Sequence, residues 1–406
     1  MKASIISFII MLFLLIPVIS LSQQESQFQG PAHDGIYQET GLMKSWPDNG
    51  PELLWRVNGL GNGYSSPAIA SSNVFITGEL DGTGFLFSFD RSGNLRWKKP
   101  YGDEWMVSYS GPRSTPVVSG DYVYTLSGMG KITCFHTDTG IIIWSLDMLA
   151  DLHGNQVFYG FSESLLIDGD TLYCLPGGAD TNIVALHRIT GEIIWVSKGI
   201  GETAGYVSPV IASQSGRDML ICMSEYSIYS LDKSSGKLLW EHDVDTELDL
   251  ACNYPIVEEG VVYYVTGPGN GAVKLELSND GESVKQIWKN SELDSYFGGF
   301  IKAGDFLYGA SSKQRNIVSV NHHSGETEQR LDFFKGAVVF ADGMIYVYNQ
   351  KGEMGLIAIS NGTMKLISVF RPAYGSREPY AFPIIHNGIL YIRHGETLMA
   401  YNIKEN

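Results

Sequence analysis

Four polar residues, Arg113, Glu163, Asn253 and Lys335, lie in equivalent short segments of this 406-residue sequence, each just ahead of an apolar run. A guanidinium, a carboxyl group, an amide and an amine can bind an anion, hold a cation or move a proton. Eight such segments occur, and seven carry an aromatic residue at or next to the same position. If the segments converge in space, they form a funnel with aromatic walls and a few charged groups, the composition of a small-molecule site.

These segments recur because the chain is built from a repeat of about 45 residues. The clearest part of the repeat is a turn followed by Trp, and Gly precedes the Trp by four residues in all four clear copies. The clear copies end at Trp97, Trp144, Trp195 and Trp240, a looser copy ends at Trp288, and two degenerate copies follow at 324–329 and 361–367. A period of this length indicates stacked or ring-forming units, and we expect the Trp side chains to pack between those units.

Each repeat contains four predicted strands. A Ser-Pro-Val-Val type of strand is followed by a turn and a Val-Tyr-Val type of strand, as in 115–118 with 122–124. β-Branched and aromatic residues bounded by Gly, Asn or Asp are typical of strands, and Pro is tolerated at the start of one. The first strands are expected near residues 66, 115, 164, 208, 255, 299, 337 and 383.

The last repeat lacks a fourth strand, and an unpaired Trp strand at 52–55 precedes the first repeat. The two fragments complete one unit if the chain closes into a ring. The sequence therefore predicts an all-β fold, an eight-bladed β-propeller over residues 52–406 that is closed by its N-terminal strand.

The N-terminus has the layout of a secretory signal. Lys2 precedes an apolar run at 5–19 and small residues up to Ser22. The run is short for a membrane span of about 20 residues, although an uncleaved anchor is the alternative. We predict a signal peptide at 1–22, a lead-in segment at 23–51, and an exported chain, periplasmic or secreted, without a transmembrane segment after cleavage.

Composition and the positions of the Cys and His residues make several functions and site types less favourable. The net charge of −16 opposes binding to nucleic acid, because long-range repulsion acts before contact. The four Cys residues show no CxxC spacing, so we expect buried thiols rather than a disulfide scaffold or a zinc site. The nine His residues form no predicted metal-ligand cluster, and His136 and His187 are expected to stabilise turns.

The turn-Trp pattern resembles the repeat of the pyrroloquinoline quinone (PQQ) propellers, with 185–195 as the best match. The resemblance covers 52–406 and extends to the opening at 28–35, which is similar to secreted PQQ-like proteins labelled by likeness to BamB or to polyvinyl-alcohol dehydrogenase. It implies the propeller fold. It leaves function open, because the repeat occurs in catalytic quinoproteins and in non-catalytic scaffolds.

In the catalytic quinoproteins the funnel face binds PQQ and calcium, and the resemblance carries some of these roles to matching positions. The cofactor-binding residues it implies, together with the aromatic wall, are Tyr64, Arg113, Ser114, Thr115 and Tyr206, and the implied calcium ligands are Glu163 and Asn253. The sequence departs from the enzymes in lacking their adjacent-Cys disulfide, a Trp beneath the cofactor, a haem-attachment CxxCH, and an Asp soon after 267–271.

Two functions stay open. The first is a binding module of the cell envelope that takes a small molecule or a protein at the funnel face. The second is a PQQ- and calcium-dependent alcohol or sugar dehydrogenase. A lyase or hydrolase lacks the paired carboxylates it would need. For Arg113 and Glu163, an ion pair between neighbouring blades is the alternative to a ligand role.

Overall fold

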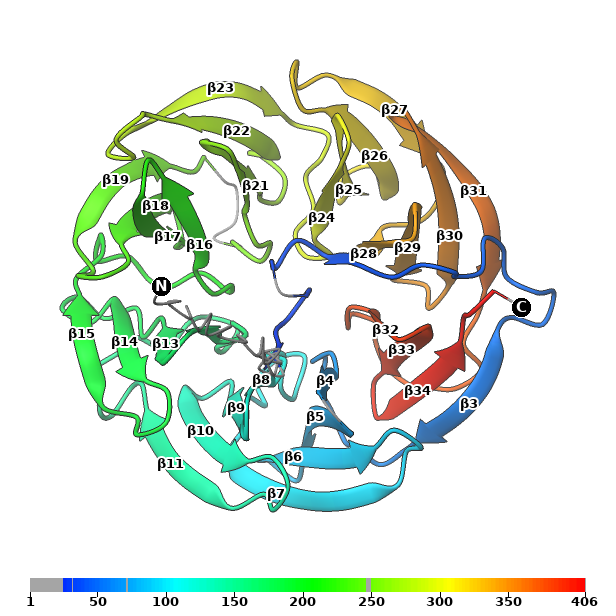
Figure 1. Ribbon diagram of the computed structural model, residues 1–406, viewed down its shortest axis with the longest axis horizontal. Coiled ribbons are helices and arrows are strands. Elements are labelled where there is room, and N and C mark those ends of the chain that lie inside the picture. Colours follow the sequence, from blue (N-terminus) through cyan, green and yellow to red (C-terminus); the bar gives the residue numbers. More distant parts are fainter. Residues whose placement is uncertain (1–24, 31, 71, 246–249, 406) are drawn as a thin grey trace, which may run out of the picture.

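The computed structural model describes residues 25–30, 32–70, 72–245 and 250–405, which form eight sheets around a central axis (Figure 1). The predicted all-β, eight-bladed propeller is thereby confirmed. The predicted signal peptide, 1–22, lies outside the described residues. Over the described part of the chain, no helical segment has the length and apolar character needed to cross a membrane.

The first four blades each contain four strands, numbered outward from the axis. They are β4 (Ala68–Ala70), β5 (Asn73–Leu80), β6 (Thr83–Asp90) and β7 (Leu95–Asp103); β8 (Val117–Ser119), β9 (Tyr122–Leu126), β10 (Lys131–His136) and β11 (Ile142–Asp147); β12 (Leu166–Asp168), β13 (Thr171–Cys174), β14 (Ile183–His187) and β15 (Ile193–Ser197); and β16 (Val210–Gln214), β17 (Arg217–Met223), β18 (Ser227–Asp232) and β19 (Leu238–Asp243).

The remaining blades follow the same order. They are β20 (Ile256–Glu258), β21 (Val261–Val265), β22 (Ala272–Leu277) and β23 (Val284–Asn290); β24 (Phe300–Ala303), β25 (Phe306–Ser311), β26 (Asn316–Asn321) and β27 (Thr327–Leu331); β28 (Gly336–Ala341), β29 (Met344–Asn349), β30 (Met354–Ser360) and β31 (Thr363–Phe370); and β32 (Ile384–His386), β33 (Ile389–His394) and β34 (Thr397–Asn402) with β3 (Glu52–Val57). All eight inner strands begin within a few residues of the predicted positions.

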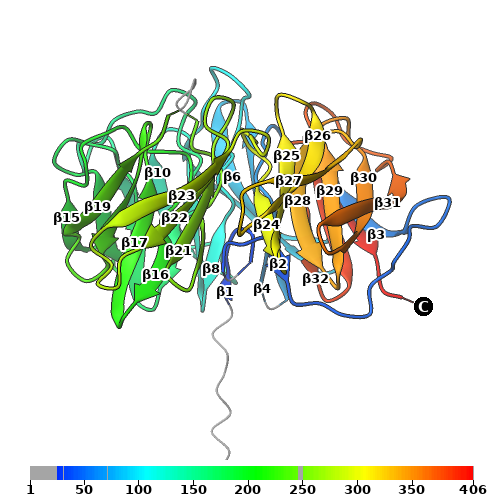
Figure 2. The same ribbon diagram turned by 90° about the horizontal axis from the view of Figure 1, so that it is seen from above.

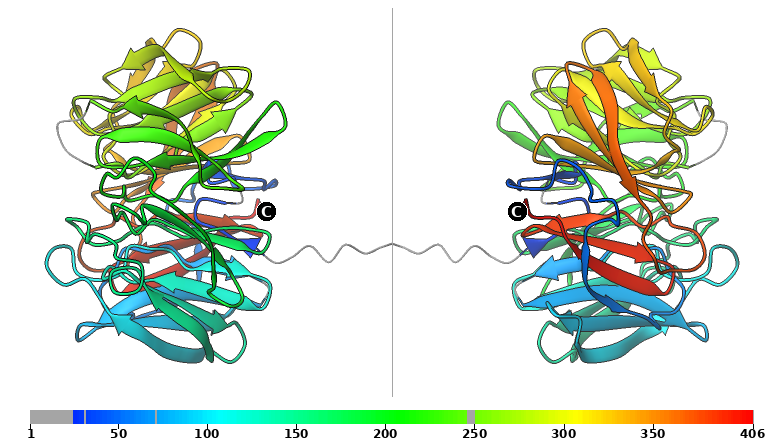
Figure 3. Two further views of the ribbon diagram at one scale, coloured as in Figure 1. Left: turned by 90° about the vertical axis from the view of Figure 1, so that its left-hand side faces the viewer. Right: turned by 90° about the vertical axis from the view of Figure 1, so that its right-hand side faces the viewer.

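The eighth blade closes the ring as predicted. Its outer strand, β3, pairs antiparallel with β34, with Trp55 opposite Ala400. Segments beyond these strands also join the two chain ends, since the Met43 amide donates to the Ile403 carbonyl (2.9 Å) and the Glu405 amide to the Gly41 carbonyl (2.8 Å). Figure 3 shows the red C-terminal strands beside the blue N-terminal segment. The ring is therefore held by strand pairing and by a second set of backbone hydrogen bonds.

The Gly and Trp of the repeat meet across blade boundaries. Gly140 has a φ of +64°, and a Cβ added there would lie 2.8 Å from Cδ2 of Trp97 in the preceding blade. Gly191 lies against Trp144 in the same way, and the Trp144 indole donates to the Arg188 carbonyl (2.9 Å). The predicted packing of Trp residues between blades is confirmed, and the Gly is required both for its backbone conformation and for space.

His136 and His187 stabilise their turns as predicted. Nδ1 of His136 accepts the Asp138 amide (3.2 Å), and Nδ1 of His187 accepts the Thr190 amide (3.3 Å).

The lead-in crosses the centre of the ring, which was not expected from the sequence (Figures 1 and 2). β1 (Glu25–Ser26) pairs antiparallel with β8, and β2 (Ile36–Tyr37) pairs parallel with β28. The residues between them, 27–30 and 32–35, turn back on themselves and are called here the axial plug. Within the plug the Gly35 amide donates to the Gln29 carbonyl (3.0 Å). Both short strands join the far ends of inner strands, so the plug enters the channel from the end where the inner strands finish.

Candidate funnel site

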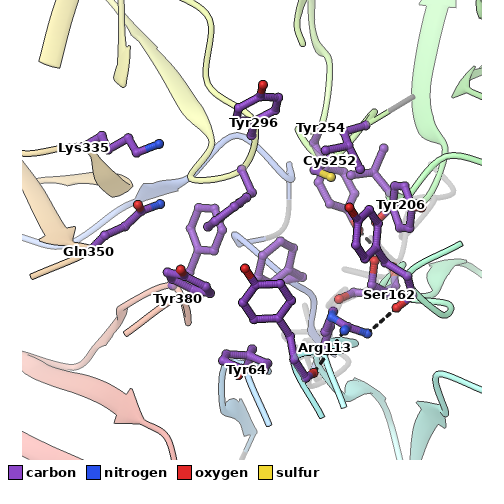
Figure 4. A pocket seen from close by; sticks show the side chains of 18 residues that line it. Tyr64, Arg113, Ser162, Tyr206, Cys252, Tyr254, Tyr296, Lys335, Gln350 and Tyr380 are labelled. Carbon is purple, nitrogen blue, oxygen red and sulfur yellow. Dashed lines mark hydrogen bonds between the residues drawn. The ribbon is translucent and has the colours of Figure 1, made fainter. Parts of the chain in front are cut away.

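A cavity of about 440 Å³ lies at the opposite end of the axis, where the inner strands begin (Figure 4). Ten of its eighteen lining residues are aromatic, and nearly all come from the segments that lead into the inner strands. The lining residues are Phe28, Tyr64, Tyr109, Arg113, Tyr159, Ser162, Ser164, Tyr206, Val207, Leu250, Cys252, Tyr254, Tyr296, Phe297, Lys335, Gln350, Tyr380 and Phe382. The predicted aromatic funnel is therefore present, and its volume suits a small ligand or a short peptide segment.

Six aromatic rings of the wall form two groups. Tyr380 contacts Tyr64, Tyr109 and Phe297 with ring centroids 5.8, 6.0 and 4.9 Å apart. Tyr159 and Tyr206 pack with centroids 6.2 Å apart, and the Tyr159 carbonyl accepts a hydrogen bond from Arg113 (2.6 Å). These ring contacts restrict the side-chain conformations before a ligand binds. A ligand that packs on the rings therefore causes a smaller loss of side-chain entropy.

The axial plug provides the floor of the funnel. The ring of Phe28 packs against Tyr254 (5.6 Å) and edge-on against Phe382 (5.1 Å). His33 stacks on Tyr254 with parallel rings 5.0 Å apart, and burial lowers the pKa of His33 to about 4. At neutral pH His33 is therefore uncharged. The floor is aromatic, and it separates the funnel from the far end of the channel.

Arg113 and Lys335 bring positive charge to the funnel. The Arg113 guanidinium donates to the backbone carbonyls of Tyr159 (2.6 Å), Ser108 (2.7 Å) and Tyr109 (3.0 Å). Burial lowers the pKa of both cations, and none of the eighteen described lining residues is Asp or Glu. Backbone carbonyls orient a guanidinium without cancelling its charge. An anionic group entering the funnel would therefore meet two partly desolvated cations.

Tyr64 and Tyr206 lie in the funnel together with Arg113, as predicted from the sequence. The Tyr64 hydroxyl donates to Oε2 of Glu378 (2.9 Å), and the Tyr206 carbonyl accepts from Ser162 (3.4 Å). Three of the five predicted cofactor-binding residues are thus brought to one cavity. Whether they contact a ligand stays a prediction.

Ser114 and Thr115 lie behind the wall and do not line the cavity. The Thr115 hydroxyl accepts the Ser66 amide (3.0 Å) from the preceding blade, and the Thr115 amide donates to the hydroxyl of Ser164 (2.9 Å) in the next. The buried Ser114 hydroxyl has no partner within the described chain. Thr115 therefore links three blades around the axis.

Glu163 and Asn253 are also buried outside the cavity lining. Oε1 of Glu163 accepts the Leu175 amide (3.0 Å), and Oε2 has no partner among the described residues. Burial raises the Glu163 pKa to about 8, so the carboxyl group is mostly protonated at pH 7. None of the ion pairs formed by described residues joins Arg113 to Glu163, so the alternative interpretation, an ion pair between blades, is wrong.

The Asn253 side chain has a full set of hydrogen bonds. Its amide donates to the carbonyls of Val265 (3.0 Å) and Ser295 (2.8 Å), and its oxygen accepts the Gly299 amide (3.0 Å). Calcium prefers ionised carboxylates and free carbonyl oxygens. A protonated Glu163 and a fully bonded Asn253 do not fit a calcium ion in this arrangement. Calcium binding by Glu163 and Asn253 stays a prediction, which a calcium titration tests.

Some lining residues were missed from the sequence. Tyr109 lies four residues before Arg113 in a long loop, and Gln350 lies in the turn between β29 and β30.

The cysteine prediction is confirmed for Cys134, Cys174 and Cys222, which are free, buried and within strands. Cys252 forms no disulfide with a described residue; it lies half-buried in a loop and lines the funnel.

Comparison with known sequences shows the family to which this chain belongs. Residues 82–330 match a family model described as "Outer membrane protein assembly factor BamB". BamB of Kangiella koreensis is 29% identical over 179 residues, 43% of this chain and 42% of that protein. A quinoprotein ethanol dehydrogenase of Pseudomonas putida is 23% identical over 58% of this chain and 33% of its own length. The chain thus aligns with less than half of the length of each of these two relatives.

A solved structure with the same fold is that of BamB from Moraxella catarrhalis. It superposes with a TM-score of 0.61 at 14% identity, over 87% of this chain and 98% of that one. At this identity the likeness supports the propeller fold alone.

Proposed function

The chain belongs to the PQQ-repeat family described as outer membrane protein assembly factor BamB, and on that premise we propose that it is an exported propeller that binds a partner in the cell envelope. The partner contact is the funnel. The ligand is an extended segment of another protein that carries aromatic and acidic side chains. The signal-like N-terminus and the relatives named as outer-membrane assembly factors support the envelope location.

The composition of the funnel carries the proposal. Ten aromatic side chains and two cations line it, and no carboxylate occurs among the described lining residues. An acidic side chain that enters the funnel is attracted to the positive charges of Arg113 and Lys335. Aromatic or aliphatic groups of the same ligand pack on the aromatic side chains of the lining. A basic or strongly polar ligand would gain neither contribution.

Exposed apolar side chains beside the mouth favour a protein ligand over a small molecule. Val107 is 81% exposed and Phe158 is 72% exposed, and both lie in loops that enter inner strands at the funnel end. Phe158 packs edge-on against the lining residue Tyr159, with ring centroids 4.8 Å apart. The apolar surface is therefore continuous from the rim into the cavity. A peptide segment can cover both parts, whereas a ligand confined to about 440 Å³ covers only the inner one.

Selection from a displayed library of random twelve-residue peptides tests this function. We expect the chain without residues 1–22 to enrich peptides that combine aromatic and acidic residues. A selected peptide should bind Lys335→Gln about tenfold more weakly and bind Lys365→Gln unchanged, because Lys365 is exposed on the outer strand β31. Failure to enrich such peptides, or equal binding to both variants, contradicts the proposal.

A PQQ- and calcium-dependent dehydrogenase remains the second candidate, because one relative is named as a quinoprotein ethanol dehydrogenase. Thermal unfolding with and without PQQ and calcium tests it. A specific ligand at one hundred times its Kd stabilises by about 2.7 kcal/mol. A shift that Arg113→Gln abolishes would favour the dehydrogenase, and no shift would favour the binding module.

A further inference from the structure

Asp305, His322 and His323 form a cluster at the end of the sixth blade that faces away from the funnel. Asp305 lies in the turn between β24 and β25, and the two His residues lie in the turn between β26 and β27. Because consecutive strands are antiparallel, both turns lie at the same end of the blade, opposite the start of β24. One nitrogen of each His and one Asp305 oxygen lie within 4.8 Å of one another. The prediction that the His residues form no metal-ligand cluster is therefore wrong, because two of them lie together with a carboxylate at ligand spacing.

The same two turns are joined in other blades, which gives an internal comparison. The His322 amide donates to the Asp305 carbonyl (3.0 Å), and the matching residues in the third and fourth blades make the same bond. In those blades the side chains form ion pairs, Arg188 with Asp170 (3.6 Å) and Lys233 with Asp218 (2.8 Å). A guanidinium or an ammonium has no lone pair for a metal ion, whereas an imidazole has one. The sixth blade alone among these three places metal-ligand groups at this position.

The distances suit a small transition-metal ion after minor adjustment. Oδ1 of Asp305 lies 3.7 Å from Nε2 of His322 and 3.7 Å from Nε2 of His323. Bonds of about 2.0–2.1 Å around a tetrahedral zinc ion place neighbouring ligand atoms about 3.3 Å apart. The side chains of Asp305 and His323 are each 67% exposed, so both can move closer without disturbing the core.

Neighbouring groups hold His322 in a suitable orientation. Its Nδ1 lies 2.8 Å from the hydroxyl oxygen of Tyr263, which can accept a hydrogen bond from Nδ1–H and so leave the Nε2 lone pair for a metal ion. Its backbone carbonyl accepts from the Trp288 indole (3.0 Å) and from Lys274 (3.3 Å). The ring is thus positioned from the fifth blade, and its Nε2 is directed toward Asp305 and His323.

We propose that Asp305, His322 and His323 bind one divalent transition-metal ion of the zinc class at the boundary of the fifth and sixth blades. Two imidazole nitrogens and one carboxylate suit zinc rather than calcium, which prefers a larger set of oxygen ligands. A water molecule takes the fourth coordination position, and a further ligand can replace this water. This site is independent of the funnel and of the proposed partner.

A zinc titration of the untagged chain, in competition with a chromogenic chelator, tests the site. We expect one zinc ion per chain, with affinity lowered about tenfold or more by His323→Ala and by Asp305→Asn. His136→Ala is the matched control, because His136 is the last residue of β10, directly before the corresponding turn of the second blade, and it should leave the affinity unchanged. Circular dichroism of each variant confirms that it is folded.

Two measurements separate this site from weak binding elsewhere on the surface. Tyr263→Phe should lower zinc affinity while leaving one ion per chain, because Tyr263 only positions His322. Cobalt(II) bound in place of zinc should give visible absorption bands that His323→Ala removes. The proposal is overturned if no stoichiometric zinc binds, if His136→Ala lowers the affinity as much as His323→Ala, or if excess calcium displaces the zinc.

Discussion

Replacing the buried carboxyl group of Glu163 by an amide, Glu163→Gln, should stabilise the protein at high pH. Glu163 lies fully inside the protein, with one oxygen bonded to the Leu175 amide and the other without a partner in the described chain. Burial raises its pKa from the ordinary value of 4.5 to about 8. Because Gln has nearly the same shape and stays uncharged, the variant keeps the packing and removes the ionisation.

The direction of the pH effect follows from the raised pKa. Between pH 4.5 and about pH 8, the unfolded chain releases the Glu163 proton and the folded chain keeps it. The stability that this group contributes is therefore complete below pH 4.5 and is lost as the pH rises toward 8. At about 1.4 kcal/mol per pH unit, the loss over this range is at most about 5 kcal/mol. Glu163→Gln should not show this loss.

Denaturant unfolding monitored by Trp fluorescence, at pH 5 and at pH 8, measures the effect. We expect the stability of Glu163→Gln to be near that of the parent at pH 5 and to exceed it by several kcal/mol at pH 8. Glu328→Gln is the control, because Glu328 is exposed on β27. A difference between Glu163→Gln and the parent that does not change with pH would refute the reasoning. If calcium binds Glu163, millimolar calcium should stabilise the parent at pH 8 but not the variant.

Three further predictions concern the plug and the blade contacts. Because burial lowers the pKa of His33 to about 4, the stability it contributes is lost as the pH falls from 6.5 through 4, and His33→Gln should remove up to about 3 kcal/mol of that acid destabilisation in unfolding titrations. Thr115→Val leaves the buried Ser66 amide without its acceptor and should cost about 1–3 kcal/mol in denaturant unfolding, whereas no change would show that water replaces the hydroxyl. Trp144→Phe should cost about 1 kcal/mol more than Trp240→Phe, because the Trp144 indole is hydrogen-bonded and the Trp240 indole has no partner among the described residues; equal losses would contradict this.

The ring could be predicted from the sequence because its signals are local and repeated. Gly140 and the residue four positions later, Trp144, belong to one short turn-and-strand unit, and each makes a contact with a different neighbouring blade. The same two requirements recur around the ring, so the period of the sequence reports the period of the structure. The missing fourth strand of the last repeat then identifies β3 as the strand that closes the ring.

The aromatic wall of the funnel could be predicted for a related reason. Topology alone brings the segments before the inner strands to one end of the axis, so Tyr64, Arg113 and Tyr206 meet whatever their neighbours are. Topology does not predict whether a polar side chain in these segments faces the cavity or is buried behind its wall. Asn253 is hydrogen-bonded to groups from two other segments, Val265 at the end of β21 and Ser295 and Gly299 in the loop between β23 and β24, and no local pattern indicates those partners.

The axial plug and the metal-ligand cluster could not be predicted because they depend on contacts between distant segments. β1 and β2 are two residues long, too short for a hydrophobic pattern, and each pairs with a strand that lies far along the chain. Asp305 and His322 lie in separate turns that only the antiparallel order of the blade brings together.

The most direct test of the funnel as the partner site is photo-crosslinking in cells that produce the protein. A photoreactive phenylalanine analogue replaces Tyr109 in the funnel or, as the control, Ile194 on the outer strand β15; both native side chains are 51% exposed. We predict that the probe at 109 links to one envelope protein, that Lys335→Gln weakens this adduct, and that the probe at 194 does not form it. The same adducts from both positions, or none from position 109, would contradict a partner-binding funnel.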